Sequence, residues 1–248
     1  MRNLSPDELV KHSVDLVKKL EDADANVRCA ACEALGKLSP HELVKHSVDL
    51  VKKLEDADAD VRQVACRALG NFPPVELAKH ASELVRNMEA HDAVVRCAAC
   101  RALGSLSPDE LVKHSVDFVK KLEDADANVR CAACEALGNL SPDELVKHSV
   151  DLVKKLEDAD ANVRCAACRA LGSLSPDELV KHSVDLVKKL EHADAIVRCA
   201  ACRALGSFCP DELVKHSVDL VKKLEDADAH NMEAHDAVVR CAACRALG

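Results

Sequence analysis

The stretch Ala25–Gly36, ANVRCAACEALG, recurs seven times in near-identical form along the 248 residues of the chain. Each copy is rich in alanine and cysteine, and its length suits a helix of about three turns. The copies end at the only glycines of the protein, which are Gly36, Gly70, Gly104, Gly138, Gly172, Gly206 and Gly248. The first six are 34 residues apart and the last interval is 42, so the sequence is a tandem repeat.

Each repeat is predicted to contain two helices joined by a tight turn. In LSPDEL, Ser5 caps a helix and Glu8 completes a capping box, and this first helix runs to about Glu21. Asp24 caps the second helix, and Gly36 is expected to end it as a left-handed C-terminal cap. The serine cap recurs at Ser39, Ser107, Ser141 and Ser175.

Both helices have an apolar side at the helical period. The buried side of the first helix is predicted to comprise Leu9, Val10, Val14, Leu16, Val17 and Leu20. The buried side of the second is predicted to comprise Val27, Ala30, Ala31, Ala34 and Leu35, with Asn26, Cys29 and Glu33 opposite. One such pair cannot bury its own apolar surface, so successive pairs must stack.

The predicted fold is therefore all-α, an α-solenoid of seven stacked helix-turn-helix repeats that form one domain over 1–248. The repeats are 4–37, 38–71, 72–105, 106–139, 140–173, 174–207 and 208–248. The last repeat carries eight extra residues, which either extend its first helix or form a looser connection. Both terminal repeats keep the apolar pattern of internal ones, so we expect end-to-end self-association.

The second helix resembles that of the HEAT repeat family, including the short HEAT-like repeats of phycobilisome lyases. A tetratricopeptide repeat has the same length, but its aromatic positions have no counterpart here. The resemblance rests on Asp24, Val27, Arg28, Ala30, Ala31, Ala34, Leu35 and Gly36. It implies a protein-binding scaffold in which these aspartates and arginines join successive repeats in a polar ladder. The ladder would comprise Asp24, Asp58, Asp92, Asp126, Asp160, Asp194 and Asp236 with Arg28, Arg62, Arg96, Arg130, Arg164, Arg198 and Arg240.

Composition argues against several function classes. The formal charge is −9 and the only aromatic residues are Phe72, Phe118 and Phe208, so neither a basic field nor stacking platforms for nucleic acid are present. No apolar run approaches the length of a membrane span, and the chain starts MRNLSPDE without an apolar signal segment. Its 14 cysteines are then expected to be reduced thiols in a cytoplasmic protein.

Six repeats carry a CAAC pair, which admits more than one interpretation. A redox pair is disfavoured, because the first cysteine is about five residues into the helix and follows no strand. Zinc needs four ligands and each repeat offers two, so no metal site is assigned. Cysteine as a small residue between close helices is the leading interpretation, with binding of a soft metal as the alternative.

The residue at the position of Glu33 changes charge from repeat to repeat, which makes it the most informative position for function. It reads Glu, Arg, Arg, Glu, Arg, Arg, Arg along the chain, a net-basic stripe in an acidic protein. In a HEAT-like stack the second helices line the concave face, so this stripe is either an ordinary charged surface or a groove for an acidic or extended peptide. The candidate partner-binding residues are Cys29, Glu33, Gln63, Arg67, Cys97, Arg101, Cys131, Glu135, Cys165, Arg169, Cys199, Arg203, Cys241 and Arg245.

No catalytic arrangement is recognisable, because glycine is confined to helix ends and no serine lies beside a plausible base. The leading hypothesis is a non-enzymatic scaffold without a cofactor that binds protein or peptide. An accessory subunit of a bilin lyase is the alternative that the resemblance implies. A thiol-rich binder of soft metals is the third hypothesis.

Overall fold

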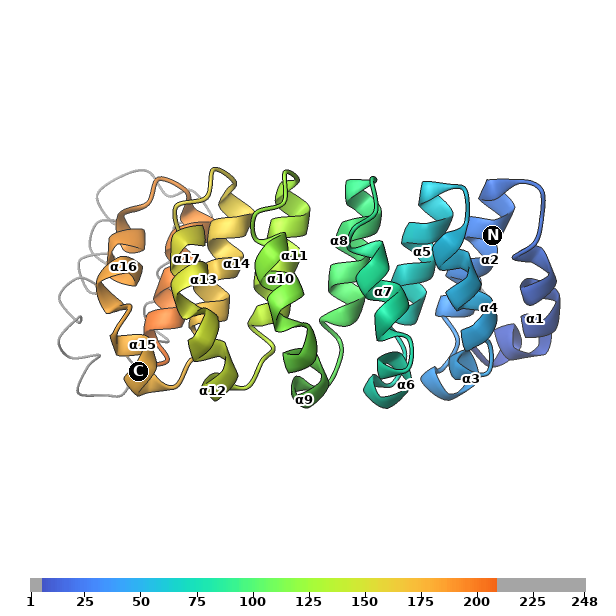
Figure 1. Cartoon of the computed structure of the whole chain (residues 1–248), viewed down its shortest axis with the longest axis horizontal. Coiled ribbons are helices and arrows are strands. Elements are labelled where there is room, and N and C mark those ends of the chain that lie inside the picture. Colours follow the sequence, from blue (N-terminus) through green and yellow to red (C-terminus); the bar gives the residue numbers. More distant parts are fainter. Residues whose placement is uncertain (1–5, 209–248) are drawn as a thin grey trace. The chain divides into compact units, whose positions relative to one another are not determined.

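The computed structural model describes residues 6–208, and all of its regular elements are helices. It confirms the predicted all-α solenoid fold of stacked helix-turn-helix repeats (Figure 1). Contacts divide the chain into two compact units, 1–117 and 118–248. Expectations for Ser5 and for residues 209–248, among them the insert, Asp236, Arg240, Cys241 and Arg245, lie outside the described residues.

Unit 1 contains three hairpins and the start of a fourth. Its elements are α1 (Pro6–Lys19), α2 (Ala25–Gly36), α3 (Pro40–Val44), α4 (Ser47–Lys52), η1 (Lys53–Glu55), α5 (Ala59–Leu69), α6 (Pro74–Ala78), α7 (Ala81–Asn87), α8 (Ala93–Leu103), α9 (Pro108–Leu111), η2 (Val112–His114) and the first residues of α10 (Ser115–Lys121). The second helices α2, α5 and α8 pack side by side in that order, and the first-helix segments cover them.

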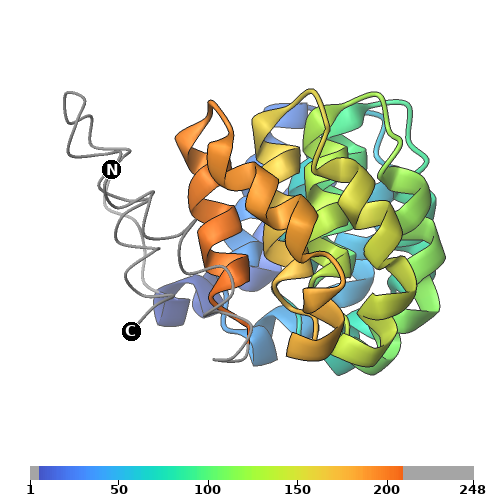
Figure 2. The ribbon, with the colours of Figure 1, turned by 90° about the vertical axis from the view of Figure 1, so that its left-hand side faces the viewer.

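Unit 2 repeats this arrangement. Its elements after α10 are α11 (Ala127–Leu137), α12 (Pro142–Leu145), η3 (Val146–His148), α13 (Ser149–Lys155), α14 (Ala161–Leu171), α15 (Pro176–Val180), α16 (Ser183–Lys188), η4 (Lys189–Glu191) and α17 (Ala195–Leu205). Here α11, α14 and α17 form the row of second helices. In Figure 2 the orange segments α15 and α16 lie beside α17 and show one complete hairpin.

Among residues 6–208, the first helix of a repeat is continuous only in α1. In each later described repeat it breaks at the histidine of the KHS or KHA segment, so the single long helix that the sequence predicts is wrong there. The serine after the histidine compensates for part of the break. Ser149 is 6% exposed, and its hydroxyl donates to the Val146 carbonyl at 2.9 Å, so this polar group is satisfied inside the stack.

The N-terminal caps are confirmed on the second helices and only in part on the first. Asp58, for example, accepts hydrogen bonds from the N–H groups of Asp60 and Val61. Ser39 accepts from the N–H of Glu42, but Ser107, Ser141 and Ser175 make no side-chain cap. The capping box fails because Glu42 pairs with Lys45 at 2.7 Å instead of reaching back to the serine.

The glycines are needed for close packing and not for a left-handed turn. Gly138 has φ −64° and ψ −13°, and no glycine of the described chain has positive φ, so the predicted left-handed caps are wrong. A Cβ at Gly138 would lie 3.0 Å from the Cα of Ala170 in the next repeat. The same approach joins Gly172 to Ala204 and Gly36 to Ala68. Glycine therefore lets neighbouring second helices touch backbone to backbone.

The buried side of the first helix is narrower than predicted. Leu9, Ser13 and Leu20 are buried, while Val14 is 65% exposed although we placed it in the core. These buried residues follow a narrow stripe along the helix, and Val14 lies about 100° around the helix from Ser13, well outside it. The equivalent valines are also exposed, and they are Val48, Val116, Val150 and Val184.

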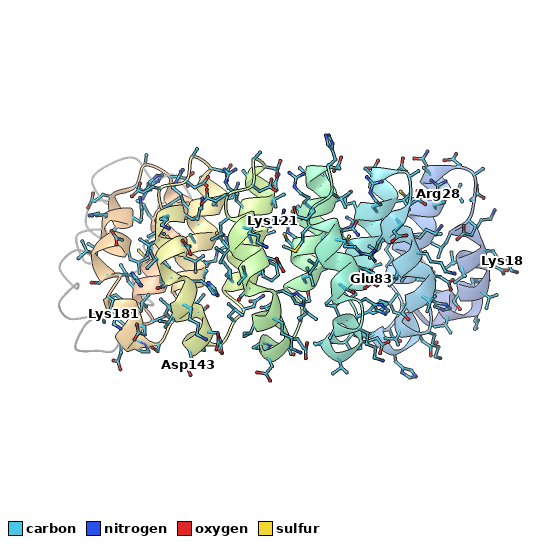
Figure 3. All side chains as sticks on the ribbon, in the orientation of Figure 1. Lys18, Arg28, Glu83, Lys121, Asp143 and Lys181 are labelled. Atoms are coloured by element: carbon cyan, nitrogen blue, oxygen red, sulfur yellow. The ribbon has the colours of Figure 1, made fainter. Side chains whose placement is uncertain are left out.

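A polar ladder joins successive repeats, but it uses a different aspartate from the predicted one. Arg28 grips Asp56 of the next repeat with Nε at 2.9 Å and Nη2 at 2.8 Å, while its Nη1 donates to the carbonyls of Asp22 and Ala23. The predicted partner, Asp58, caps its own helix instead. Arg130 and Asp158 form the same contact in unit 2. Figure 3 shows Arg28 at the edge of unit 1 that carries the α1–α2 turn.

A second ion pair crosses some of the same junctions. Lys53, Lys155 and Lys189 are almost fully covered, and each reaches a glutamate of the preceding repeat. The distances from Nζ to the carboxylates of Glu21, Glu123 and Glu157 are 3.0, 2.9 and 2.7 Å. The lysine stem fills the junction while its charge reaches water beside the glutamate.

Candidate partner-binding groove

The charged position that varies among the repeats is exposed wherever the structure describes it. It lies in the last turn of each second helix, and Glu33, Arg67 and Arg101 carry it in unit 1. Glu135, Arg169 and Arg203 carry it in unit 2. Because successive second helices pack side by side, each unit presents these side chains as a row on one face.

In unit 1 this row borders a groove of about 440 Å³ that spans α2, α5 and α8. Its lining alternates small residues with charged ones. The small residues are Gly36, Ala68, Gly70, Ala98 and Ala102. Close backbone packing of the glycines leaves no side chains to fill this space, so the feature that brings the helices together also hollows the surface.

The groove has more cationic than anionic side chains at its border. Glu33 lies 3.3 Å from Lys37, and both side chains are 58% exposed. Within residues 6–208, neither Arg67 nor Arg101 makes an ion pair, so both guanidinium groups are available to a ligand. Asn71 adds an amide that donates to the Gly36 carbonyl at 3.2 Å and so joins the first two repeats.

The first cysteine of each CAAC pair was predicted to lie on this surface, and in most described repeats that prediction is wrong. Cys97, Cys131, Cys165 and Cys199 are all buried, and only Cys29 and Gln63 are half-exposed among the described residues at this position. The reason is that the next repeat covers them. The Cys131 Sγ, for example, lies 3.8 Å from the Asn162 carbonyl oxygen at the start of α14.

The second cysteine of each pair lies deeper. Burial raises the pKa of Cys32, Cys66 and Cys168 to about 12, and it raises the pKa of Cys134 as well. A raised pKa disfavours the thiolate, which is the form that binds soft metals and attacks electrophiles. These thiols therefore pack as small apolar groups.

The row in unit 2 differs in one contact. The Arg169 Nη2 lies 3.0 Å from the Cys165 Sγ, four residues earlier on the same helix. This contact holds the guanidinium against α14. Cys241 and Arg245, the last two predicted members of the site, lie outside the described residues.

Sequence reasoning identified the charged row and missed the residues between its members. Lys37, Asn71 and Ser105 each directly follow a repeat glycine and line the groove. Their signal was present, since the residue after each glycine is polar in every described repeat. Among residues 6–208, no helix is long and apolar enough to cross a membrane.

Comparison with known proteins identifies the repeats. The family model of HEAT repeats matches residues 47–114, 115–185 and 149–229, and a single HEAT repeat matches residues 14–41. A search of curated proteins finds no match. These findings do not show the closer similarity to phycobilisome lyases that the sequence suggested.

Solved structures with a similar fold include engineered and designed proteins. One engineered protein is 32% identical over 98% of this chain and 70% of its own length, with a TM-score of 0.61. Another is 29% identical over 81% of this chain and 96% of its own length, with the same TM-score. A designed armadillo repeat protein in complex with the peptide (KR)4 is 22% identical over 79% of this chain and 98% of its own, with a TM-score of 0.62. The family matches cover most of the sequence, and the chain belongs to the HEAT repeat family.

Proposed function

We propose that this protein is a non-enzymatic scaffold that binds an extended, acidic segment of a protein partner in the groove along its second helices. The observation that carries the proposal is the groove itself, which crosses three successive repeats and has two unpaired arginines, Arg67 and Arg101, at its border. A groove that continues across repeats fits an elongated ligand better than a compact one.

Charge sets the expected chemistry of the ligand. Arginine binds carboxylates through two parallel hydrogen bonds, so aspartate and glutamate side chains suit Arg67 and Arg101. The designed armadillo repeat protein named above binds the basic peptide (KR)4. This chain carries cations along its groove, and we therefore infer a partner of opposite charge. The small lining residues leave room for the peptide backbone between the arginines.

The test measures binding of a fluorescently labelled peptide of alternating Asp and Glu, with (KR)4 as the charge-reversed comparison. Arg67→Glu with Arg101→Glu is expected to weaken binding of the acidic peptide about 100-fold, since each of the two lost charge-assisted contacts is worth about 1.5 kcal/mol. Added salt should also weaken binding of the acidic peptide to the wild type, because it screens the charges.

A matched control separates the groove from net charge. Lys45→Glu with Lys79→Glu changes the charge of unit 1 by the same amount at exposed first-helix positions outside the groove lining. This control is expected to bind like the wild type. Equal losses in both double variants would show that the peptide responds only to overall charge, and the groove would be rejected.

A further inference from the structure

The arginines of the polar ladder do not all have a carboxylate partner. In unit 1 Arg28 has one and Arg62 has none, and both lie away from the groove. Arg28 shows the complete arrangement. Its Nη1 is fixed by two backbone carbonyls of its own repeat, and its Nε and Nη2 form a fork that grips Asp56. Asp56 is only 7% exposed, so the carboxylate fits into a formed recess between the repeats.

Arg62 is fixed in the same way and lacks the carboxylate. Its Nη1 donates to the carbonyls of Asp56 and Ala57 at 2.6 and 3.0 Å, which match the contacts of Arg28. The residue that corresponds to Asp56 in the next repeat is Ala90. Consequently the Nε and Nη2 of Arg62 have no hydrogen-bond partner among residues 6–208.

The neighbouring carboxylate does not replace the missing one. Asp92 follows Ala90 in the same turn, but it caps α8 by accepting from the N–H groups of Val94 and Val95. The lysine of the second ion pair is replaced here, because Asn87 stands where Lys53 and Lys155 stand in other repeats and donates to the Glu83 carbonyl. Glu55 of the preceding repeat pairs with the exposed Arg86 at 3.7 Å instead. The junction between α5 and α8 therefore keeps a fixed guanidinium that has no carboxylate hydrogen-bonded to its Nε and Nη2.

Arg164 in unit 2 also lacks a carboxylate partner, but its surroundings differ from those of Arg62. His192 stands in the position of the carboxylate there, and its Nδ1 accepts from the Asp194 N–H at 2.9 Å. The Arg164 Nε is buried and has no partner, so a ligand has no access to it. By contrast, the Arg62 Nε also has no partner but is accessible to solvent.

We propose that the Arg62 fork, opposite Ala90, is a binding site for a carboxylate. The ligand takes the place that Asp56 holds at Arg28, with its two oxygens on Nε and Nη2. A small carboxylate anion and the side chain of an aspartate or glutamate from another protein share this chemistry. Because Arg62 lies in the first turn of α5 and the groove is formed by later turns, this site is separate from the proposed peptide groove.

The experiment follows the Arg62 Nε–H signal by NMR on the full chain during titration with acetate, and separately with a blocked Gly-Glu-Gly tripeptide. Chloride at equal ionic strength is the reference. Saturable movement with both ligands shows a site for any carboxylate, and saturation with the tripeptide alone shows a site for a presented side chain. Linear movement with both ligands, equal to that in chloride, would overturn the proposal.

Thermal unfolding supplies a second measurement with matched variants. Acetate at about ten times its Kd should raise the wild-type Tm by about 3 °C over chloride. Arg62→Gln removes the fork and Ala90→Asp fills it, so both variants should lose this increment. Asp56→Ala opens a second vacant fork at Arg28, and acetate should raise its Tm more than that of the wild type. The same acetate response in all four proteins would show a general solvent effect and contradict the proposal.

Discussion

Two junctions of unit 2 have the same packing and differ in their polar contacts. Between α11 and α14, Arg130 grips Asp158 through two hydrogen bonds of 2.8 Å. Between α14 and α17, Arg164 faces His192 and its Nε has no partner. Yet at both junctions a Cβ added to the glycine would lie only 3.0–3.1 Å from the Cα of an alanine in the next second helix. The difference teaches that helix contact forms the stack, and that the ladder adds to a junction which packs without it.

The histidine replaces only half of what the aspartate does. Asp158 accepts from the Asp160 N–H at 2.9 Å and also binds the arginine of the preceding repeat. His192 keeps the first contact, from the Asp194 N–H, and offers no anion for the second. The turn is thus preserved by either residue, whereas the link between repeats requires a carboxylate.

The largest effect is expected from Asp158→Ala. It leaves the half-buried Arg130 without its anion, and breaking such a pair should cost about 3 kcal/mol of unfolding free energy. The equivalent His192→Ala loses one neutral hydrogen bond and should cost about 1 kcal/mol. Urea denaturation followed by circular dichroism compares the two. Similar losses would mean that the ion pair adds nothing to its junction.

The packing shared by the two junctions can be tested with Gly138→Val and Gly172→Val. Each adds a side chain where even a Cβ would lie about 3 Å from the next helix, and overpacking of this kind should cost about 2 kcal/mol. The same urea measurement should give similar losses for both, because this contact does not depend on the ladder. Ser173→Val, at the exposed neighbour of Gly172, is the control and should be nearly neutral.

The missing contact can be restored with His192→Asp. The new carboxylate should pair with Arg164 as Asp158 pairs with Arg130, and raise the unfolding free energy by about 1 kcal/mol. His192→Asn keeps an acceptor for the Asp194 N–H but carries no charge, so it separates the turn from the ion pair. An equal gain in the asparagine variant would contradict the ladder explanation.

The smallest effect is the part of the pH dependence of stability that His192 contributes at the second junction. Burial, together with the charges of Arg164 and Lys189, lowers the pKa of His192 below its usual value of 6.5. The unfolded chain therefore binds this proton more readily, and stability should fall as the pH decreases below about 6.5. Burial also lowers the pKa of His148, so the wild type must be compared with His192→Asn. Identical pH profiles for these two proteins would exclude His192 as the source.

Much of the local structure could be predicted from the repeat. The period of 34 residues, the aspartate caps and the second helices follow from local chemistry, and the structure agrees with them. The exposure of Arg67 and Arg101 was also predictable, because a charged side chain recurs at a position away from the apolar side.

The errors arose where neighbouring repeats contact one another. Helical periodicity describes one face of one helix, but a second helix in a stack is covered on two further sides. Cys131 was therefore expected on the surface, whereas the start of α14 covers it. Asp58 and Asp56 are both acidic and two residues apart, and only the geometry of the junction decides which one Arg28 reaches. The role of Gly138 was hidden for the same reason, since its constraint lies in Ala170 of the next repeat.

The glycine–alanine contact has a consequence for how the chain finds its own order. The four junctions within the two units offer nearly the same small residues, so helix packing alone cannot distinguish the correct neighbour from another copy. Out-of-order docking is a known hazard of repeat chains. The polar residues do distinguish copies. If the hairpin carrying His192 docked on α11, Arg130 would lose the carboxylate that Asp158 provides. Because the ladder residues differ from repeat to repeat, they favour docking of each repeat on its correct neighbour in an otherwise repetitive sequence.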